Sequence, residues 1–166
     1  MALTQRGIGK AGWGTAWLLA QLRYGPMPHV HVSRFEARSY EIDSYRHLNN
    51  GVFLAWFEHA RLQFLQSLGF SYDLFADRKQ WIVVARTEVD FRAPLHAGDV
   101  VDLSTEVIAL GRSSVRFRQA MRPVRDGAPQ EAPACEALTV MVFSGGSGRS
   151  IPIPEDFRAA LGSLAG

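Results

Sequence analysis

Residues 43–69 read DSYRHLNNGVFLAWFEHARLQFLQSLG and hold the pattern that decides the fold. Apolar residues recur here at spacings of three and four, which is typical of a helix. They are Phe53, Phe57, Ala60, Phe64 and Leu68. Asn49 and Asn50 offer side-chain acceptors to the free N–H groups of a first turn, and Gly69 is a typical helix stop. The stretch therefore predicts one helix of about five turns.

More apolar residues lie on the other sides of this predicted helix. They are Leu54, Trp56, Leu62 and Leu65. A helix that is apolar on several sides is usually covered on several sides. We therefore expect a central helix that is enclosed on most of its surface.

Runs with strand composition precede and follow the helix. Val30–Tyr40 comes before it. The runs after it are Trp81–Phe91, Val100–Ala109, Ser113–Arg122 and Ala134–Phe143. The short joins between them favour antiparallel neighbours, while Tyr72–Arg78 and Glu155–Leu164 read as short helices. The chain is therefore expected to be an α+β domain, an antiparallel five-stranded sheet wrapped around one long helix.

Length and composition indicate one folded domain. The chain has 166 residues, of which 47% are hydrophobic and 20% charged, as expected for a globular core. We expect this domain to span residues 27–166 and the Gly-rich residues 1–26 to be an extension, with a short helix over Thr15–Arg23. The apolar run Ala11–Ala20 is too short to span a bilayer, which needs roughly 20 apolar residues. No small-residue cleavage site of the signal-peptide kind follows it.

Charge and cysteine content narrow the functional classes. The net charge is only +2 and the basic residues are spread along the chain, whereas nucleic-acid binding usually needs a basic stripe. Cys135 is the only cysteine, which excludes an intrachain disulfide and a multi-cysteine metal site. A reducing, cytoplasmic setting is expected. Cys135 itself lies among apolar residues in a predicted strand and reads as a core residue.

The segment Asp43–Asn50 places an acid, a histidine and two amides between the first strand and the helix. In this it resembles the 4-hydroxybenzoyl-CoA thioesterase-like branch of the hotdog acyl-CoA thioesterases, with a Glu-x-x-Arg pattern on the helix that follows. The resemblance continues in Glu58-His59-Ala60-Arg61, Phe91-Arg92-Ala93-Pro94, Gly98-Asp99 and Gly111-Arg112-Ser113-Ser114. It implies the hotdog fold and hydrolysis of an acyl-CoA to a free acid and coenzyme A, with no metal or cofactor.

Several residues are candidates for the catalytic chemistry that this resemblance implies. Thioester hydrolysis needs a carboxylate that attacks the carbonyl or activates water, and Asp43 can supply it. Taken alone, an Asp before Ser is more often a turn or capping carboxylate. His47 either orients water or substrate or fills a hydrogen-bonding site. By resemblance, a backbone N–H of Asn50 or Gly51 at the helix start holds the oxyanion, where free N–H groups and the helix dipole favour negative charge.

Glu58 and the coenzyme A contacts are less specific candidates. Glu58 and Arg61 are one helical turn apart, and on an enclosed helix we expect a structural ion pair, with a catalytic Glu58 as the alternative. By resemblance, the coenzyme A phosphates contact the turn Arg112-Ser113-Ser114 and Arg149, for which arginine is well suited. The alternative for these residues is an ordinary solvated loop.

Two departures from the resembling pattern keep other functions open. Arg46 stands where the pattern has glycine, and Tyr45 replaces a small or amide residue. Both favour a noncatalytic acyl-CoA-binding hotdog protein as the first alternative. A hotdog hydratase or dehydratase is the second, because an acid and a histidine could also act at a β-carbon.

The predicted sheet has edges that are hazardous to expose, and the helix needs more cover than one sheet gives. The resemblance implies a homodimer or homotetramer with sites between subunits. Each site is then expected to use Asp43 from one chain and coenzyme A contacts from both.

Overall fold

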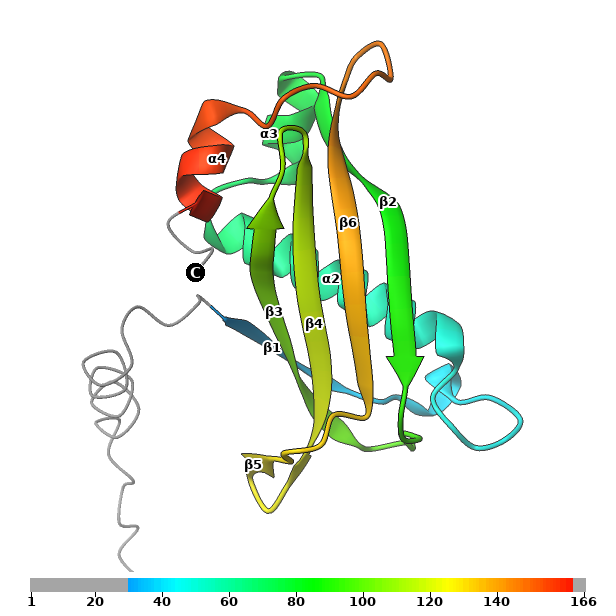
Figure 1. Cartoon of the computed structure of the whole chain (residues 1–166). Coiled ribbons are helices and arrows are strands. Elements are labelled where there is room, and N and C mark those ends of the chain that lie inside the picture. Colours follow the sequence, from blue (N-terminus) through cyan, green and yellow to red (C-terminus); the bar gives the residue numbers. More distant parts are fainter. Residues whose placement is uncertain (1–29, 163–166) are drawn as a thin grey trace, which may run out of the picture.

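The computed structural model describes residues 30–162, which form a curved sheet with one long helix lying against it (Figure 1). In chain order the elements are β1 (His31–Glu36), the 3-10 turn η1 (Ser39–Glu41), α2 (Asn50–Ser67), α3 (Tyr72–Asp77), β2 (Gln80–Phe91), β3 (Val100–Leu110), β4 (Ser114–Arg125), β5 (Ala128–Pro129), β6 (Cys135–Gly145) and α4 (Glu155–Gly162). The predicted extension, residues 1–26, and the predicted end of the last helix at Leu164 lie outside the described residues.

The sheet is antiparallel, with strand order β1-β3-β4-β6-β2. The five predicted strands are all present, and the prediction of an antiparallel sheet around a long helix is confirmed. The sequence did not predict β5, a two-residue strand that pairs only with the end of β4. Asp126 and Gly127 make its hairpin possible, because both have the positive φ angles, 53° and 80°, that a tight two-residue turn requires.

Local signals at both ends of α2 explain its length. The side chain of Asn49 accepts a hydrogen bond from the backbone N–H of Gly51 at 2.8 Å, which caps the first turn. Gly69 follows the helix with a φ of 87°, and the N–H of Phe70 donates back to the carbonyl of Leu65 at 3.0 Å. This pattern is a Schellman ending, in which a left-handed glycine closes the last turn.

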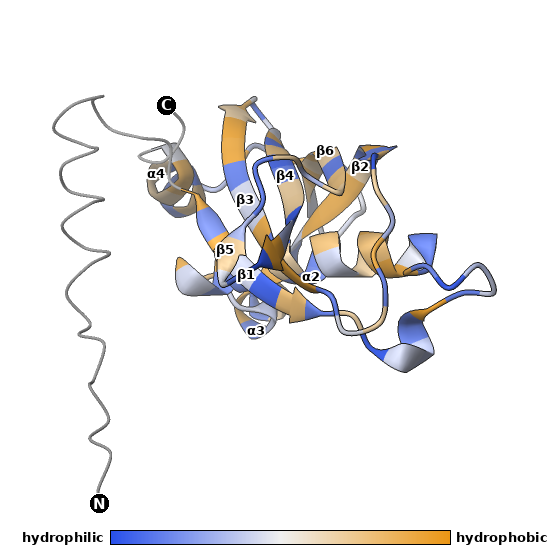
Figure 2. Ribbon diagram, turned by 90° about the horizontal axis from the view of Figure 1, so that it is seen from below, coloured by the Kyte–Doolittle hydropathy of each residue, from blue (hydrophilic) through white to orange (hydrophobic). Residues whose placement is uncertain are grey.

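The strands alternate between a face that packs on α2 and a face that lies outside. In β4, Val115, Phe117 and Met121 are fully buried beneath α2, whereas Arg116 and Arg118 are exposed on the other face. Figure 2 looks along the sheet and shows α2 lying against one side of it. The period-two alternation of these strands therefore sets which residues face the helix.

The expectation that α2 is enclosed on most sides is wrong for the single chain. Trp56 and Leu65 are buried, but Leu54 is 47% exposed and Leu62 is 42% exposed. Leu62 lines a cavity that faces β2, and neither side chain is fully covered. The apolar residues around the helix thus include exposed positions, which sequence spacing alone does not distinguish from core positions.

Strand β2 forms one edge of the sheet. It pairs only with β6, and its residues from Val83 to Glu88 are all exposed. The hydrogen-bonding groups of its other side are therefore available to a further strand.

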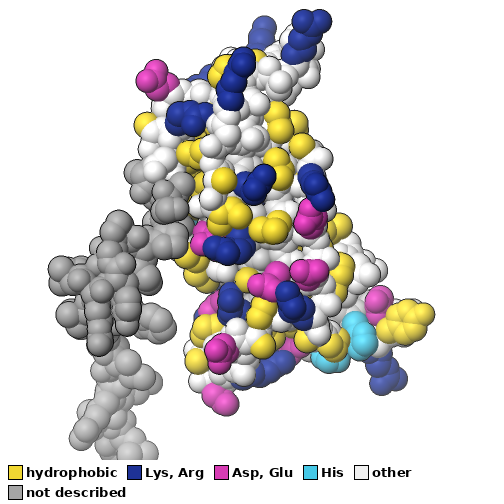
Figure 3. All heavy atoms as spheres, viewed as in Figure 1, with side chains coloured by type: hydrophobic (Ala, Val, Ile, Leu, Met, Phe, Trp, Pro, Cys, Tyr) yellow, Lys and Arg dark blue, Asp and Glu magenta, His cyan; other side chains and the backbone are white. Residues whose placement is uncertain are grey.

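The outer face of the sheet carries charges of both signs (Figure 3). Arg34 pairs with Asp102 at 2.7 Å, and Arg118 pairs with Glu106. Acidic partners thus lie beside these two basic side chains. Within residues 30–162 no helix is both long and apolar enough to cross a membrane.

Candidate active site

The segment between β1 and α2 forms a tight turn that is organised by Asp43. The carboxylate oxygen Oδ1 of Asp43 accepts hydrogen bonds from the backbone N–H groups of Tyr45, at 2.8 Å, and His47, at 3.2 Å. The other oxygen, Oδ2, makes no hydrogen bond to any residue from 30 to 162. Asp43 therefore has the structural role of a turn residue and still keeps one carboxylate oxygen for chemistry.

Arg46 occupies a left-handed position in this turn. Its φ is 65°, and its backbone N–H donates to the carbonyl of Asp43 at 3.0 Å. Side chains with a Cβ atom avoid this conformation, and glycine adopts it freely. The resembling pattern has glycine at this place, and the geometry explains why. Arg46 keeps the turn and carries its strain.

The start of α2 offers one free backbone donor. The N–H of Gly51 is already bonded to Asn49, and the N–H of Val52 donates to the carbonyl of Asn49 at 2.9 Å. The N–H of Asn50 has no partner among the described residues. Of the two oxyanion donors that the sequence suggested, the geometry therefore favours Asn50, at the positive end of the helix dipole.

A cavity of about 280 Å³ lies beside this helix start. His47, Leu48, Asn50, Phe53, Phe91, Arg92, Ala93 and Pro94 line it. The rings of Phe53 and Phe91 meet edge to face, with centroids 5.4 Å apart, and form its apolar wall. The cavity thus joins the polar turn and helix start to an apolar surface, as a site for an acyl thioester requires.

His96 is a neighbour of this site that sequence reasoning missed. Its ring lies 5.4 Å from the ring of His47, at an angle of 82°. Its backbone N–H donates to Asp99 at 2.8 Å, and the guanidinium of Arg125 lies 2.8 Å from the same carboxylate. The sequence signal was present, since His96 stands two residues before the quoted Gly98-Asp99, but nothing in it linked His96 to His47.

These contacts lower the pKa of Asp99. Partial burial raises the pKa of Asp99, but the hydrogen bonds from Arg125 and from the N–H of His96, with the two positive charges, outweigh it. The pKa of Asp99 is therefore below its ordinary value of 3.8. The carboxylate stays ionised and fixes the loop that carries His96.

Glu58 does not form the expected ion pair with Arg61. Glu58 is exposed, and among the described residues no carboxylate lies in salt-bridge contact with the Arg61 guanidinium. Arg61 is instead buried and donates to Gln119 of β4 at 2.7 Å. Burial lowers the pKa of Arg61 to about 10, and the charge of Glu58 opposes this shift from a distance. The neutral amide of Gln119 therefore replaces the carboxylate as the partner.

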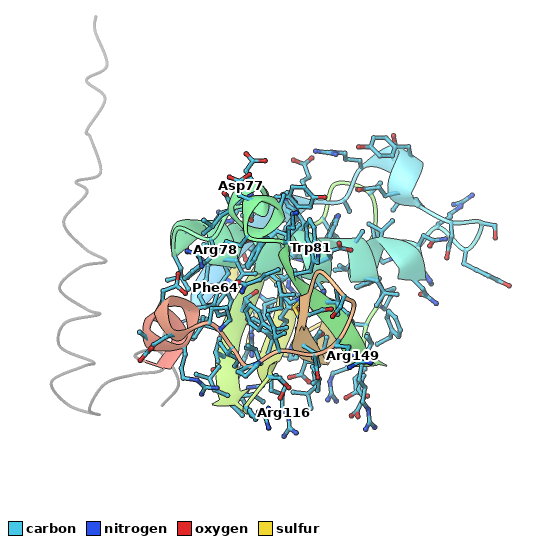
Figure 4. All side chains as sticks on the ribbon, turned by 90° about the horizontal axis from the view of Figure 1, so that it is seen from above. Phe64, Asp77, Arg78, Trp81, Arg116 and Arg149 are labelled. Atoms are coloured by element: carbon cyan, nitrogen blue, oxygen red, sulfur yellow. The ribbon has the colours of Figure 1, made fainter. Side chains whose placement is uncertain are left out.

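The residues expected to contact coenzyme A lie at the far end of the sheet. Ser113 accepts a hydrogen bond from the N–H of Phe143, and Arg149 accepts one from Gly145, both near the end of β6. Arg112 is exposed, and Figure 4 shows Arg149 at the edge of the molecule. Ser114 begins β4 beside them. The turn at Asp43 lies at the opposite end, where β2 finishes at Phe91 (Figure 1).

The site residues therefore fall into separate groups within one chain. Asp43, His47 and Asn50 come together around the start of α2, with Gly51 engaged by its cap. Glu58 lies two turns further along α2. The four candidate coenzyme A residues form a group of their own at the other end of the sheet.

Cys135 is a core residue, as expected. It is fully buried. Burial, with the nearby charges of Asp90 and Glu136, raises the pKa of its thiol to about 12. The thiolate form that a nucleophile needs is therefore scarce at neutral pH.

Comparison with known proteins gives the class of this fold and site. The model of the thioesterase-like superfamily matches residues 37–161, and the chain belongs to this family. It is a hotdog-fold thioester hydrolase. A curated relative, the chloroplastic acyl-acyl carrier protein thioesterase ATL3 of Arabidopsis thaliana, is 24% identical over 133 residues, which are 80% of this chain and 68% of that protein.

Solved structures share the fold. A hypothetical protein of Thermus thermophilus has a TM-score of 0.71 and 28% identity, covering 80% of this chain and 98% of its own. A hypothetical protein of Staphylococcus aureus, solved in complex with CoA, has a TM-score of 0.76 and 16% identity, covering 84% and 86%. The hotdog prediction is thus confirmed.

Proposed function

We propose that the protein hydrolyses acyl-CoA thioesters to the free acid and coenzyme A, with Asp43 as the general base. The observation that carries this proposal is the arrangement at the start of α2. There the turn held by Asp43 joins the free N–H of Asn50, and both adjoin an apolar cavity. A carboxylate and an oxyanion donor are the two groups that thioester hydrolysis needs.

The proposed reaction has two steps. Asp43 Oδ2 takes a proton from water while the water oxygen attacks the thioester carbonyl, and the N–H of Asn50 donates to the developing oxyanion. The tetrahedral intermediate then expels the coenzyme A thiolate, which takes up the proton, and the carboxylic acid remains. Direct attack by Asp43 through a mixed anhydride is the alternative. If water then attacks the Asp43 carbonyl carbon of the anhydride, one turnover in labelled water places ¹⁸O in Asp43, which the general-base route cannot do. Neither route uses a metal or organic cofactor.

His47 and the two unusual turn residues fit this proposal. His47 lines the cavity beside Asn50, where its ring can orient water or the thioester. Tyr45 is 80% exposed and does not line this cavity. Arg46 keeps the turn that glycine would form. Neither departure blocks the site, which supports an enzyme over a noncatalytic binding protein.

The carrier is proposed to be coenzyme A. Two curated relatives are named acyl-acyl carrier protein thioesterases, and one structural neighbour was solved with CoA. Both carriers present a phosphopantetheine thioester, but coenzyme A adds a nucleotide with phosphates. Arg112 and Arg149, with Ser113 and Ser114 between the strands, are proposed to bind these phosphates. We also propose a cytoplasmic setting, because a chain with a single cysteine forms no intrachain disulfide and needs no oxidising compartment.

We propose a homodimer joined through the free edge of β2. Antiparallel pairing of two β2 strands would set the Phe91 end of one chain beside the Gln80 end of its partner. Because Asp43 lies at the first end and Arg149 at the second, this pairing would bring the separate groups of site residues together. A tetramer would need a further interface on the faces that remain.

Mixing two inactive variants tests the shared site. Asp43→Asn and Arg112→Glu, each confirmed folded, are combined under conditions of proven subunit exchange. Mixed dimers hold one intact site, so partial activity returns if the sites are shared. No recovery would reject the shared geometry or the role of Arg112.

The activity itself is tested by a panel of acyl-CoA and matched acyl carrier protein esters, with release of free thiol as the readout. Hydrolysis of CoA esters with little activity on the carrier protein esters is expected. Binding without thiol release would indicate the noncatalytic alternative, and hydration of an enoyl-CoA without thiol release would indicate a hydratase.

A further inference from the structure

A second cavity, of about 260 Å³, lies between α2 and the edge strand β2. Leu62, Leu65, Ile82, Val83, Val84 and Met141 give it apolar walls, and its only other lining residues are Glu58 and Arg61. None of the residues of the Asp43 turn line it. An apolar cavity that contains one buried cation needs an explanation, because an isolated charge is costly away from water.

The Arg61 side chain is held rigidly in this wall. Arg61 is only 5% exposed, and its Nη1 donates to Oε1 of Gln119 at 2.7 Å and to Oγ1 of Thr139 at 3.4 Å. The amide nitrogen of Gln119 donates in turn to the carbonyl of Phe57 at 2.9 Å and to Oγ1 of Thr105 at 3.0 Å. These bonds fix the amide, which in turn fixes one end of the guanidinium.

The other edge of the same guanidinium is unused. Both hydrogen bonds of Arg61 within the described residues come from Nη1, and its buried Nε has no partner among them. Nε and Nη2 together present two parallel N–H donors, the geometry that binds a carboxylate through both oxygens. The protein thus positions a cation beside an apolar cavity and leaves the buried Nε of its two-donor edge without a partner among the described residues.

No carboxylate of the described chain meets this edge. Glu58 lines the same cavity, but it is exposed and forms no ion pair with Arg61. Burial lowers the pKa of Arg61 only to about 10, so the side chain is still a cation at neutral pH. The guanidinium of Arg61 therefore lacks a hydrogen-bond acceptor at this edge, and an anionic acceptor would suit its charge best.

This cavity lies further along the helix that begins at the proposed reaction centre. Arg61 stands ten residues after Gly51 on α2, and a rise of 1.5 Å per residue places its Cα about 15 Å further along. Helical side chains lean back toward the helix start. The remaining distance suits an extended acyl chain of medium length.

We propose that this cavity binds the far end of the acyl group, and that Nε and Nη2 of Arg61 bind a terminal carboxylate there. The preferred substrates are then CoA monothioesters of dicarboxylic acids. This inference rests on the proposed function and names the substrate class of the same site.

The test compares octanoyl-CoA with suberoyl-CoA, which has the same chain length and a terminal carboxylate, and with the methyl ester of suberoyl-CoA. Adipoyl- and sebacoyl-CoA extend the series to shorter and longer chains. For the full-length protein, kcat/KM from thiol release should favour suberoyl-CoA over octanoyl-CoA by about tenfold or more, as expected for hydrogen bonds to a charged group. The methyl ester, a neutral acceptor, should fall between them. Equal values for suberoyl-CoA and octanoyl-CoA would overturn the inference.

Two variants separate specificity from structure. Arg61→Lys keeps the charge but loses the two-donor edge, so the preference for suberoyl-CoA should fall severalfold. Thr139→Val is the matched control, because it removes only the weaker acceptor of Nη1, at 3.4 Å, and leaves Gln119 to hold the guanidinium, so the preference should persist. If Arg61 has only a structural role, both variants will lower stability and leave the ratio of the two substrates unchanged.

A third variant serves if both of these fail to fold. Met141→Phe enlarges a side chain in the cavity wall on β6, away from the β2 edge proposed as the dimer interface, and it should reduce the ratio of suberoyl-CoA to acetyl-CoA turnover. An unchanged ratio would exclude the cavity as the acyl site.

The proposed function and this inference fail in different ways. If octanoyl-CoA is hydrolysed as well as suberoyl-CoA, the function stands and the inference falls. If no ester is hydrolysed, the function fails, and calorimetry still tests the inference through binding. Suberoyl-CoA should then have a Kd about tenfold or more below that of octanoyl-CoA, and equal Kd values would contradict it.

Discussion

The backbone N–H of His47 donates to Oδ1 of Asp43 at 3.2 Å, and the N–H of Asp43 donates to the carbonyl of His47 at 2.8 Å. These two bonds close the turn that precedes α2. They orient the carboxylate of Asp43, leave its Oδ2 free, and place His47 in the wall of the cavity. Asp43 thus makes the contacts of a structural turn residue and keeps one oxygen free for the catalytic role that we propose.

Arg46→Gly should stabilise the protein. A left-handed residue with a Cβ atom costs roughly 1–2 kcal/mol, and the greater entropy of glycine in the unfolded chain offsets roughly 0.5–1 kcal/mol of that gain. A net gain of up to about 1.5 kcal/mol raises Tm by up to about 6 °C, which differential scanning calorimetry can measure. Arg46→Ala is the matched control, because it removes the same charge but keeps the strain. An equal rise in both variants would assign the effect to charge.

Asp99→Asn should lower the free energy of unfolding at pH 7, by about 1 kcal/mol for a partly exposed charged pair. The folded pKa of Asp99 is below its ordinary value of 3.8, so the ionised carboxylate stabilises the fold above that pH. This contribution is lost as the pH falls through the folded pKa. Urea titrations from pH 7 downward should therefore show the wild-type and Asn curves converging below pH 3.8. Asp77→Asn, at an exposed carboxylate of α3, is the control for net charge. A stability difference between the wild type and Asp99→Asn that stays constant at every pH would refute this role.

Glu58→Gln should change the free energy of unfolding by no more than about 0.5 kcal/mol, as is usual for an exposed side chain without a special contact. The reason is that Arg61 takes its hydrogen bonds from Gln119 and Thr139. Thermal unfolding and thiol release are measured together. An unchanged melting temperature with lost turnover would make Glu58 a catalytic residue. A large fall in melting temperature would instead support an ion pair between Glu58 and Arg61.

Much of the fold could be predicted from local patterns. The three-and-four spacing, the Asn49 cap and the Gly69 stop are properties of neighbouring residues, and α2 begins and ends accordingly. The period-two alternation of apolar residues in the strands likewise predicts which side chains face the helix. The short β5 escaped because two residues carry no periodicity.

The errors at the site concern contacts between distant parts of the chain. The spacing of Glu58 and Arg61 suggested a pair, but Gln119, 58 residues after Arg61, takes that place. His96 reaches His47 only because the N–H of Leu48 bonds to the carbonyl of Leu95. Spacing on one helix shows which side chains are close enough to pair. It does not show whether a side chain from a distant strand, such as Gln119, is the partner instead.

The central claim is that Asp43 supplies the base for thioester hydrolysis, and the kinetics of Asp43→Asn test it most directly. Asparagine keeps an oxygen that can accept from the N–H groups of Tyr45 and His47, so the turn, the melting temperature and acyl-CoA binding should be retained. Turnover, measured as thiol release from the best ester, should fall roughly 10²–10⁴-fold, the usual contribution of a general base. Turnover within a few fold of the wild-type value, in a variant that still folds and binds, would remove Asp43 from the mechanism.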